Sequence, residues 1–129
     1  MDSRRRYLIA NATAADPTKW NGNFVDDCYK KYDWTSIVSD GSWADAIFSV
    51  YLLKIPKGAS ECYISCPSYF CANPSAYIAV MTEDVRDSQH TIPLTTVRTP
   101  NYTISLDVSY QYVAVTCYNA STNFTFTFS

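Results

Sequence analysis

The chain has 129 residues, of which 47% are hydrophobic, 16% aromatic and 17% charged, a composition typical of one globular domain rather than of a disordered chain. Its formal net charge of −2 provides no basic surface of the kind that nucleic acid requires, so we expect no nucleic-acid partner. Residues 1–16 are expected to form an N-terminal tail or edge strand that ends at Asp16-Pro17, and residues 17–129 to form a single domain.

The first half of the domain is predicted to alternate strands with turns. Residues 26–33 carry mixed charge without a clear period, which favours a loop or a single helical turn. Residues 34–38 are a strand candidate that ends at the turn-forming residues 39–42. Residues 46–54 are the longest apolar run. Apolar side chains occur at both the odd and the even positions, which predicts a central strand covered on both faces.

Three further strands are predicted from short apolar runs that are bounded by turn residues. Residues 56–58 are expected to turn the chain before the first of them, and the acidic residues 83–87 to form a loop after the second. The predicted strands are residues 61–65, residues 77–81 and the less regular residues 92–97.

The last third of the chain, residues 101–129, shows the clearest alternation of apolar and polar side chains. After the turn-forming residues 119–123, Phe124, Phe126 and Phe128 alternate with threonines, which predicts a terminal hairpin with an aromatic inner face. The residues expected on the buried parity before that turn are Tyr102, Ile104, Leu106, Val108, Val113, Val115 and Cys117.

These elements together predict the fold class. No stretch of ten residues carries a helical stripe, and some eight short strands follow one another with turns between them. We therefore expect residues 17–129 to form an all-β, two-sheet antiparallel sandwich of about eight strands.

The chemically reactive side chains form no catalytic constellation in the sequence. Zinc sites usually pair cysteines two residues apart, whereas Cys62, Cys66 and Cys71 are spaced by three and four residues. On a strand Cys62 and Cys66 share one face with Ile64, so buried, structural thiols are the simpler interpretation. The single histidine, His90, has no nearby partner in sequence. We expect no metal, no cofactor and no enzymatic activity.

Two observations on the compartment disagree. The apolar residues 7–10 are too short for a secretory signal, which favours the cytoplasm. Four Asn-X-Ser/Thr sequons, which begin at Asn11, Asn101, Asn119 and Asn123, and five cysteines instead favour a secreted protein. A cytoplasmic location is the expectation, with secretion as the alternative.

Two segments resemble the β-sandwich domain of calpains, known as domain III. Trp20-Asn-Gly-Asn-Phe-Val-Asp-Asp-Cys28 is similar to that family's opening tryptophan-glycine turn, and YVAVTCYNASTNFTFTFS, residues 112–129, is similar to its closing strands. The resemblance covers residues 20–129 and implies a regulatory, non-catalytic module that binds a protein partner or a membrane surface. The acidic loop that carries the family's calcium and phospholipid response is not matched, because residues 54–61 contain one carboxylate.

A further segment, residues 55–58, resembles a different group of sandwich domains. Ile55-Pro-Lys-Gly58 between two apolar strands, together with the same closing strands, is similar to the prepeptidase-type domains of secreted proteases and to lysosomal binding proteins. This resemblance implies a secreted glycoprotein domain that recognises an enzyme or a glycan.

The binding surface is predicted to lie in loops, because loops at one end of a sandwich can vary without disturbing the sheets. Large aromatic residues in the loops either anchor a contact surface or cover an open end of the core, and we expect them to be more exposed than Phe48 and Phe126. The acidic loop either binds a cation or is simply solvated. The candidate binding residues are Trp43, Tyr69, Phe70, Glu83, Asp84 and Asp87.

Overall fold

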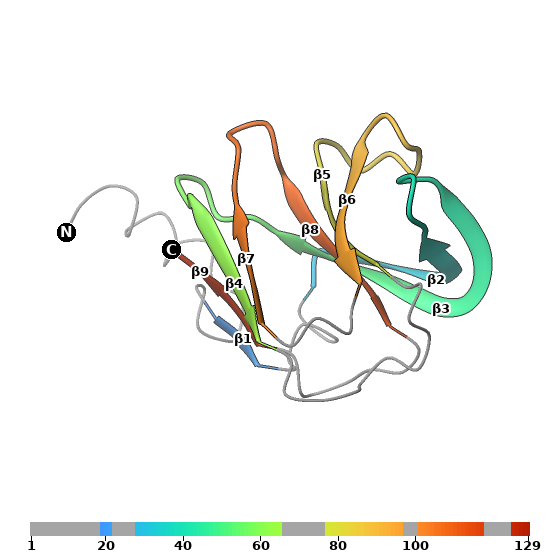
Figure 1. Ribbon diagram of the computed structural model, residues 1–129, viewed down its shortest axis with the longest axis horizontal. Helices are drawn as coiled ribbons and strands as arrows, with labels where there is room; N and C mark the ends of the chain where they lie inside the picture. Colours follow the sequence, from blue (N-terminus) through green and yellow to red (C-terminus); the bar gives the residue numbers. More distant parts are fainter. Residues whose placement is uncertain (1–18, 22–27, 66–76, 97–100, 118–124) are drawn as a thin grey trace.

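The computed structural model describes residues 19–21, 28–65, 77–96, 101–117 and 125–129 (Figure 1). The predicted N-terminal tail lies outside these residues. Nine strands lie within them: β1 (Lys19–Asn21), β2 (Lys30–Ile37), β3 (Trp43–Lys54), β4 (Glu61–Ser65), β5 (Tyr77–Met81), β6 (Thr91–Thr96), β7 (Asn101–Ser105), β8 (Tyr112–Cys117) and β9 (Thr125–Phe128).

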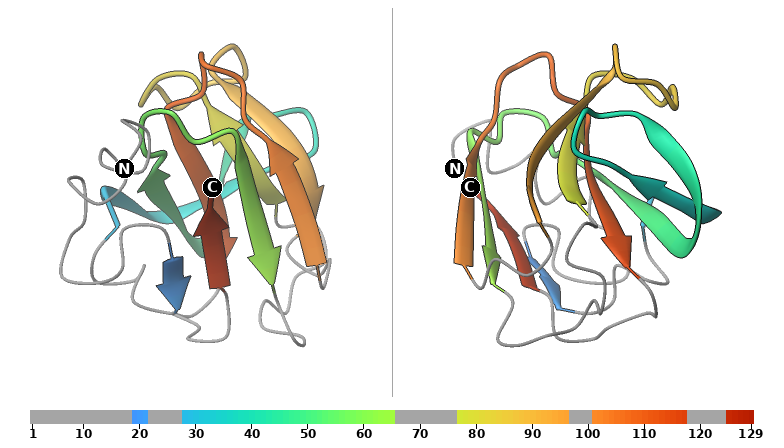
Figure 2. Two further views of the ribbon diagram at one scale, coloured as in Figure 1. Left: turned by 90° about the vertical axis from the view of Figure 1, so that its left-hand side faces the viewer. Right: turned by 45° about the vertical axis from the view of Figure 1, so that its right-hand side comes forward.

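The strands form two antiparallel sheets, as predicted from the sequence. One has the order β1-β9-β4-β7 and the other the order β2-β3-β8-β5-β6. The described residues contain no helix, so the predicted all-β sandwich is confirmed. The two sheets face each other as separate layers, and Figure 2 shows the four-stranded sheet from its outer side in the left view.

The connections between the strands follow the jelly-roll pattern. When β2 is set aside, the remaining strands have the orders β1-β9-β4-β7 and β3-β8-β5-β6. This is the arrangement of two interlocked Greek keys, in which most connections cross from one sheet to the other. Strand β2 is an addition, joined to β3 by a hairpin at the edge of the five-stranded sheet.

The predicted terminal hairpin is wrong. β8 pairs with β3 and β5 in the five-stranded sheet, whereas β9 pairs with β1 and β4 in the other sheet. The reason is the burial that each strand requires. Every residue from 112 to 116 is buried, so β8 needs cover on both faces, whereas β9 alternates buried phenylalanines with part-exposed threonines.

The main core fills the space between the two sheets. The five-stranded sheet contributes alternate residues of its three central strands, and the four-stranded sheet contributes the aromatic face that the sequence predicts on β9. Phe126 and Phe128 are 0% and 1% exposed. The buried members of this core are Phe48, Tyr51, Leu53, Cys62, Ile64, Ile78, Val80, Ile104, Val113, Val115, Phe126 and Phe128.

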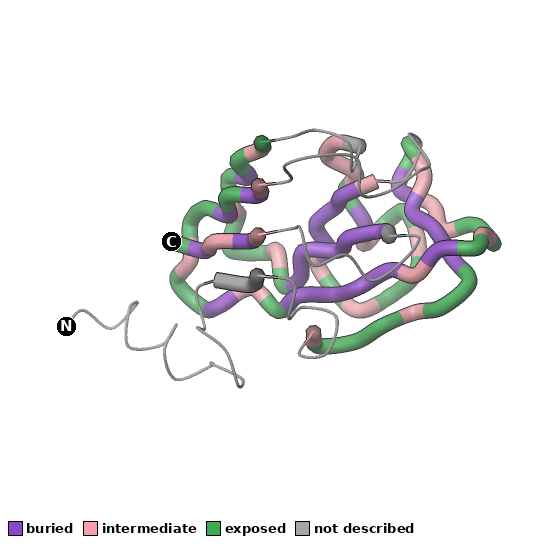
Figure 3. The backbone as a smooth tube through the Cα atoms, turned by 90° about the horizontal axis from the view of Figure 1, so that it is seen from below, coloured by how far each residue is buried: buried purple, intermediate pink, exposed green. Residues whose placement is uncertain are grey.

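A second core covers the outer face of the five-stranded sheet. Its buried members are the alternate residues of the same central strands, together with one residue of β2: Ile37, Val50, Leu52, Ala79, Met81, Tyr112 and Ala114. Tyr32, Trp43 and Tyr77 pack against them. The prediction that residues 46–54 are covered on both faces is therefore confirmed for residues 50–53, all of which are buried. Figure 3 shows these long buried stretches beside the alternating pattern of the other sheet.

The β2–β3 hairpin provides the cover for this second core. β3 is 12 residues long, but only Ser49 to Lys54 pair with β8, so the first half of β3 extends past the sheet and bends (Figure 1). The bend carries the hairpin tip back to the other strands. The backbone N–H of Ile37 donates to Oγ1 of Thr116 at 3.4 Å, and Nε1 of Trp43 donates to Oγ1 of Thr91 at 3.0 Å.

Two local predictions are wrong. Lys30 to Asp33, expected in a loop or helical turn, lie in β2, because pairing with β3 and contacts to the second core decide the conformation of this mixed-charge segment. Val108, expected on the buried face, is fully exposed. Oδ1 of Asp107 accepts hydrogen bonds from the backbone N–H and the hydroxyl of Ser109, and this turn ends the strand before Val108.

Phe126→Ala tests the main core. We expect it to lower the free energy of unfolding by about 3–5 kcal/mol, because it removes a fully buried ring and leaves a cavity. Denaturant unfolding measures the change. Thr127→Ala, on the opposite face of the same strand, is the control and should change the value by about 0.5 kcal/mol or less. Equal losses from both variants would contradict the burial described for β9.

Gly41→Ala tests the attachment of the hairpin tip. Gly41 has a φ of +84°, and a Cβ atom there would lie 2.6 Å from the carbonyl oxygen of Thr91. We expect a loss of about 1–3 kcal/mol from the backbone conformation, increased further by the clash. The exposed Gly58 has a similar φ of +87°, so Gly58→Ala estimates the conformational part alone. If the two substitutions cost the same, Gly41 does not fix the tip against Thr91.

Candidate functional site

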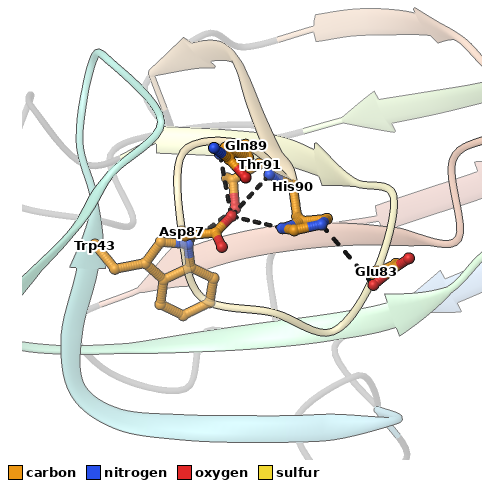
Figure 4. Close-up of polar contacts among 6 residues, drawn as sticks. All are labelled: Trp43, Glu83, Asp87, Gln89, His90 and Thr91. Carbon is orange, nitrogen blue, oxygen red and sulfur yellow. Dashed lines mark hydrogen bonds and ion pairs between the residues drawn. The ribbon is translucent and has the colours of Figure 1, made fainter.

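The loop of residues 82–90 between β5 and β6 contains the three predicted acidic residues and is held in a fixed turn. The backbone N–H of Thr82 donates to the carbonyl of His90 at 3.0 Å. Oδ1 of Asp87 accepts from the backbone N–H of Gln89 and of His90, and lies 2.7 Å from Nδ1 of His90 (Figure 4). These contacts, first among them the His90 side chain, hold the pKa of Asp87 below its usual value. Nε2 of His90 also lies 3.8 Å from Glu83.

Asp84 connects this loop to β2. It accepts a hydrogen bond of 2.6 Å from the hydroxyl of Tyr32 and a contact of 3.4 Å from Nζ of Lys30. Two cations lie over the Tyr32 ring, with Nζ of Lys30 at 4.9 Å and the guanidinium carbon of Arg86 at 4.6 Å from its centroid. The carboxylate is therefore used within the fold, where it fixes the hairpin against the loop.

Trp43, expected in a loop, is instead the first residue of β3, and it lies beside this loop although the two are far apart in the sequence. Its ring meets the Tyr32 ring edge to face, with 5.6 Å between the ring centroids. Nε1 of Trp43 donates to Oγ1 of Thr91, directly after the loop (Figure 4). Trp43 is only partly buried and so is more exposed than Phe48 and Phe126, in the order expected. Its contacts show that it closes the end of the second core.

The four predicted site residues that the structure describes therefore lie in one cluster and take part in contacts within the fold. The structure brings Trp43 together with Glu83, Asp84 and Asp87, and Tyr32 links the indole to the Asp84 carboxylate. Tyr69 and Phe70 lie outside the described residues. Within the described ranges, no three potential metal ligands of the His, Cys, Asp or Glu type converge.

Trp34 is a candidate that the sequence did not indicate. It lies within edge strand β2, is 70% exposed and has a φ of +60°, a conformation that bulky residues rarely adopt. The pairing of β2 with β3 breaks here, because Asp33 is opposite Ser49 but Thr35 is opposite Asp45. One residue of β2 thus faces three residues of β3, and the middle one, Ile47, is 60% exposed.

A polar network flanks this break. Oδ1 of Asp33 accepts from the hydroxyl of Ser49 at 2.8 Å and lies 3.3 Å from Nζ of Lys31. These contacts, with Ser49 first, hold the pKa of Asp33 below its usual value, so the carboxylate is charged at neutral pH. We call Trp34 and Ile47, together with Lys31, Asp33 and Ser49, the Trp34 surface. It combines an exposed ring, an exposed aliphatic side chain and fixed polar groups of both charges.

Cys62 is the described cysteine of the predicted cluster, whereas Cys66 and Cys71 lie outside the described residues. Its thiol is 0% exposed and faces the main core together with Ile64, as expected for a buried structural thiol. Burial raises the pKa of Cys62 to about 12, which disfavours the nucleophilic thiolate.

Thiol labelling tests this environment. At pH 8 we expect Cys62 to resist alkylation in the native protein, because the thiolate is scarce and the sulfur is inaccessible. In denaturant it should react as quickly as an ordinary thiol, and peptide mass spectrometry identifies the labelled residue. Fast labelling of Cys62 in the folded chain would show that β4 does not bury this side chain.

The described residues contain no helix with the length and apolar character needed to cross a membrane. Comparison of the chain with known proteins gave no match among family models, curated proteins or solved structures.

Proposed function

We propose that the chain is a non-catalytic β-sandwich interaction module, and that it binds a protein partner through the Trp34 surface. The observation that carries this proposal is the backbone conformation of Trp34, whose φ is +60°. A left-handed conformation of a bulky residue costs about 1–3 kcal/mol and persists where the surrounding structure enforces it, most often at functional sites. Here the strained residue presents a large aromatic ring to solvent.

The chemistry of the Trp34 surface fits a protein partner. Tryptophan is enriched at the centres of protein interfaces, where it buries a large area with few rotatable bonds. Lys31 and Asp33, which precede Trp34 in β2 and lie 3.3 Å apart, add one charge of each sign. An anionic membrane would instead favour a surface with an excess of basic residues, so a membrane surface is the weaker partner.

The placement of the reactive groups supports a role without catalysis. Cys62 is buried in the main core, whereas His90 lies between Asp87 and Glu83 in the loop of residues 82–90. Among the described residues, these groups form no pair of nucleophile and base. A regulatory module of this kind agrees with the resemblance to calpain domain III, which stays a prediction. The calcium response of that domain receives no support from Asp84, which binds Tyr32 and Lys30.

A secreted or lysosomal binding domain of the prepeptidase type, recognising an enzyme or a glycan, is the second candidate. One observation favours it over a cytoplasmic module. Asn101 and Thr103 of the sequon Asn101-Tyr102-Thr103 are both exposed on strand β7.

Trp34→Gly tests the proposal with two opposite expectations. Glycine adopts a positive φ without strain, so we expect the free energy of unfolding to stay equal or to rise by about 1 kcal/mol. The same substitution should abolish partner binding. Denaturant unfolding measures the first effect. Quantitative mass spectrometry of proteins retained by the immobilised variant and by the immobilised unsubstituted chain measures the second.

Val108→Gly is the matched control, because Val108 is fully exposed but lies in a turn away from the Trp34 surface. Proteins retained by this control and lost from Trp34→Gly support the proposal. Loss of flotation with phosphatidylserine vesicles in Trp34→Gly alone would assign a membrane surface instead, and loss of glycan-array binding would assign the second candidate. Identical behaviour of both variants in every assay would contradict a function for Trp34.

A further inference from the structure

The outer face of the four-stranded sheet differs from every other strand face in the described structure. The five-stranded sheet is covered on its outer side by the second core, whereas no described element covers this face (Figure 2, left view). Its exposed or part-exposed residues are almost all polar: Glu61, Tyr63, Ser65, Asn101, Thr103, Ser105, Thr125 and Thr127. A face of hydroxyls and amides around one aromatic ring is a poor apolar docking surface but a good support for a hydrophilic group.

The sequon Asn101-Tyr102-Thr103 lies on this face in an extended conformation. Residues two apart on a strand share a face, so Asn101 and Thr103 are on the outer side, whereas Ile104 packs in the main core. Strand β4 lies alongside, with Tyr63 opposite Thr103 and Ser65 opposite Asn101. Asn101 and Thr103, the two residues of the sequon that N-glycosylation requires, are therefore accessible in the folded domain.

Tyr63 fixes the orientation of the Asn101 amide. The two residues are diagonal neighbours across the β4–β7 pair, and the Tyr63 hydroxyl donates to Oδ1 of Asn101 at 3.0 Å. With Oδ1 directed to Tyr63, Nδ2 has no hydrogen-bond partner among the described residues and is the atom left toward solvent. Tyr63 is 44% exposed, and its ring offers an apolar surface beside Asn101.

We propose that Asn101 is an acceptor of an N-linked oligosaccharide, transferred from a polyprenyl diphosphate-linked donor to the translocated chain, a proposal that rests on the secreted candidate described above. Nδ2 of Asn101 forms a bond to the anomeric carbon of the first sugar, and the bond from that carbon to the diphosphate oxygen breaks. The lipid diphosphate leaves with the bonding electron pair, and the amide nitrogen loses one proton to a base of the transferase. No oxidant or reductant takes part.

The attached glycan has a structural role at this position. β7 is an edge strand of its sheet, and its five residues carry no charge and no proline. Edge strands of this kind pair with other chains unless they are protected. The other sheet protects its edges differently, with Pro93 in β6 and with the break at Trp34 in β2. A glycan at Asn101 shields the edge of β7, and it leaves the Trp34 surface open because β2 belongs to the other sheet.

The test is production of the full chain behind a cleavable secretion signal in a eukaryotic cell, followed by peptide mass spectrometry before and after enzymatic release of N-glycans. We expect the Asn101 peptide to carry a glycan and to contain aspartate after release. Thr103→Val should abolish the modification while leaving Asn101 and its contact with Tyr63 in place. Thr103→Ser, which preserves the sequon, is the matched control and should retain it.

The original chain, Thr103→Val and Thr103→Ser are also translated in the presence of microsomes. Modification of Asn101 in these translated chains is a second measurement, which does not depend on folding or secretion. An unmodified Asn101 in the translocated original chain overturns the proposal, as does modification that survives Thr103→Val. The result does not depend on the Trp34 surface, so the two proposals succeed or fail separately.

Discussion

The whole structure depends on three strands that are apolar on both faces. β3, β8 and β5 present one set of side chains to the main core and the alternate set to the second core, so neither face can be left to water. Each fully buried aliphatic side chain stabilises the fold by roughly 1.5–3 kcal/mol, which makes cover on both sides a strong constraint. The four-stranded sheet satisfies it on one side, and the bent β2–β3 hairpin satisfies it on the other. The contacts of Trp43, Asp84 and Thr91 follow from that second requirement.

The sequence predicts those parts of the fold that depend on local patterns. Residues 61–65 and 77–81 are strands with the predicted boundaries, because short alternating or apolar runs between turns leave few other conformations. The pairing of β8 and β9 in different sheets could not be predicted in the same way. A turn signal at residues 119–123 indicates that the chain reverses, but the neighbour of each strand is decided by residues far away in the sequence, such as the Ile64 that pairs with Phe126.

In the candidate site, too, local features can be predicted from the sequence, whereas contacts between distant residues cannot. Their residue types single out Trp43 and the acidic loop, but the contacts that join the hairpin to this loop and to Thr91 span 48 and 52 positions of the chain. The sequence predicts Trp34 only as the start of a strand, because a φ of +60° has no sequence signal when the residue is not glycine, asparagine or aspartate. The exposed ring is the result of a local mismatch between β2 and β3, which only the paired strands reveal.

The second core also makes the stability of the molecule uneven. Its cover is a single hairpin at the edge of the sheet, whose tip is attached by two hydrogen bonds and the close approach of Gly41 to Thr91. The jelly roll of eight strands does not include β2, so β2 and the first half of β3, which does not pair with β8, can open as a local unit while the two-sheet sandwich stays folded. Such an opening exposes the apolar side chains of β3, β8 and β5 to solvent, and exposed apolar patches of this kind promote aggregation under mild denaturing conditions.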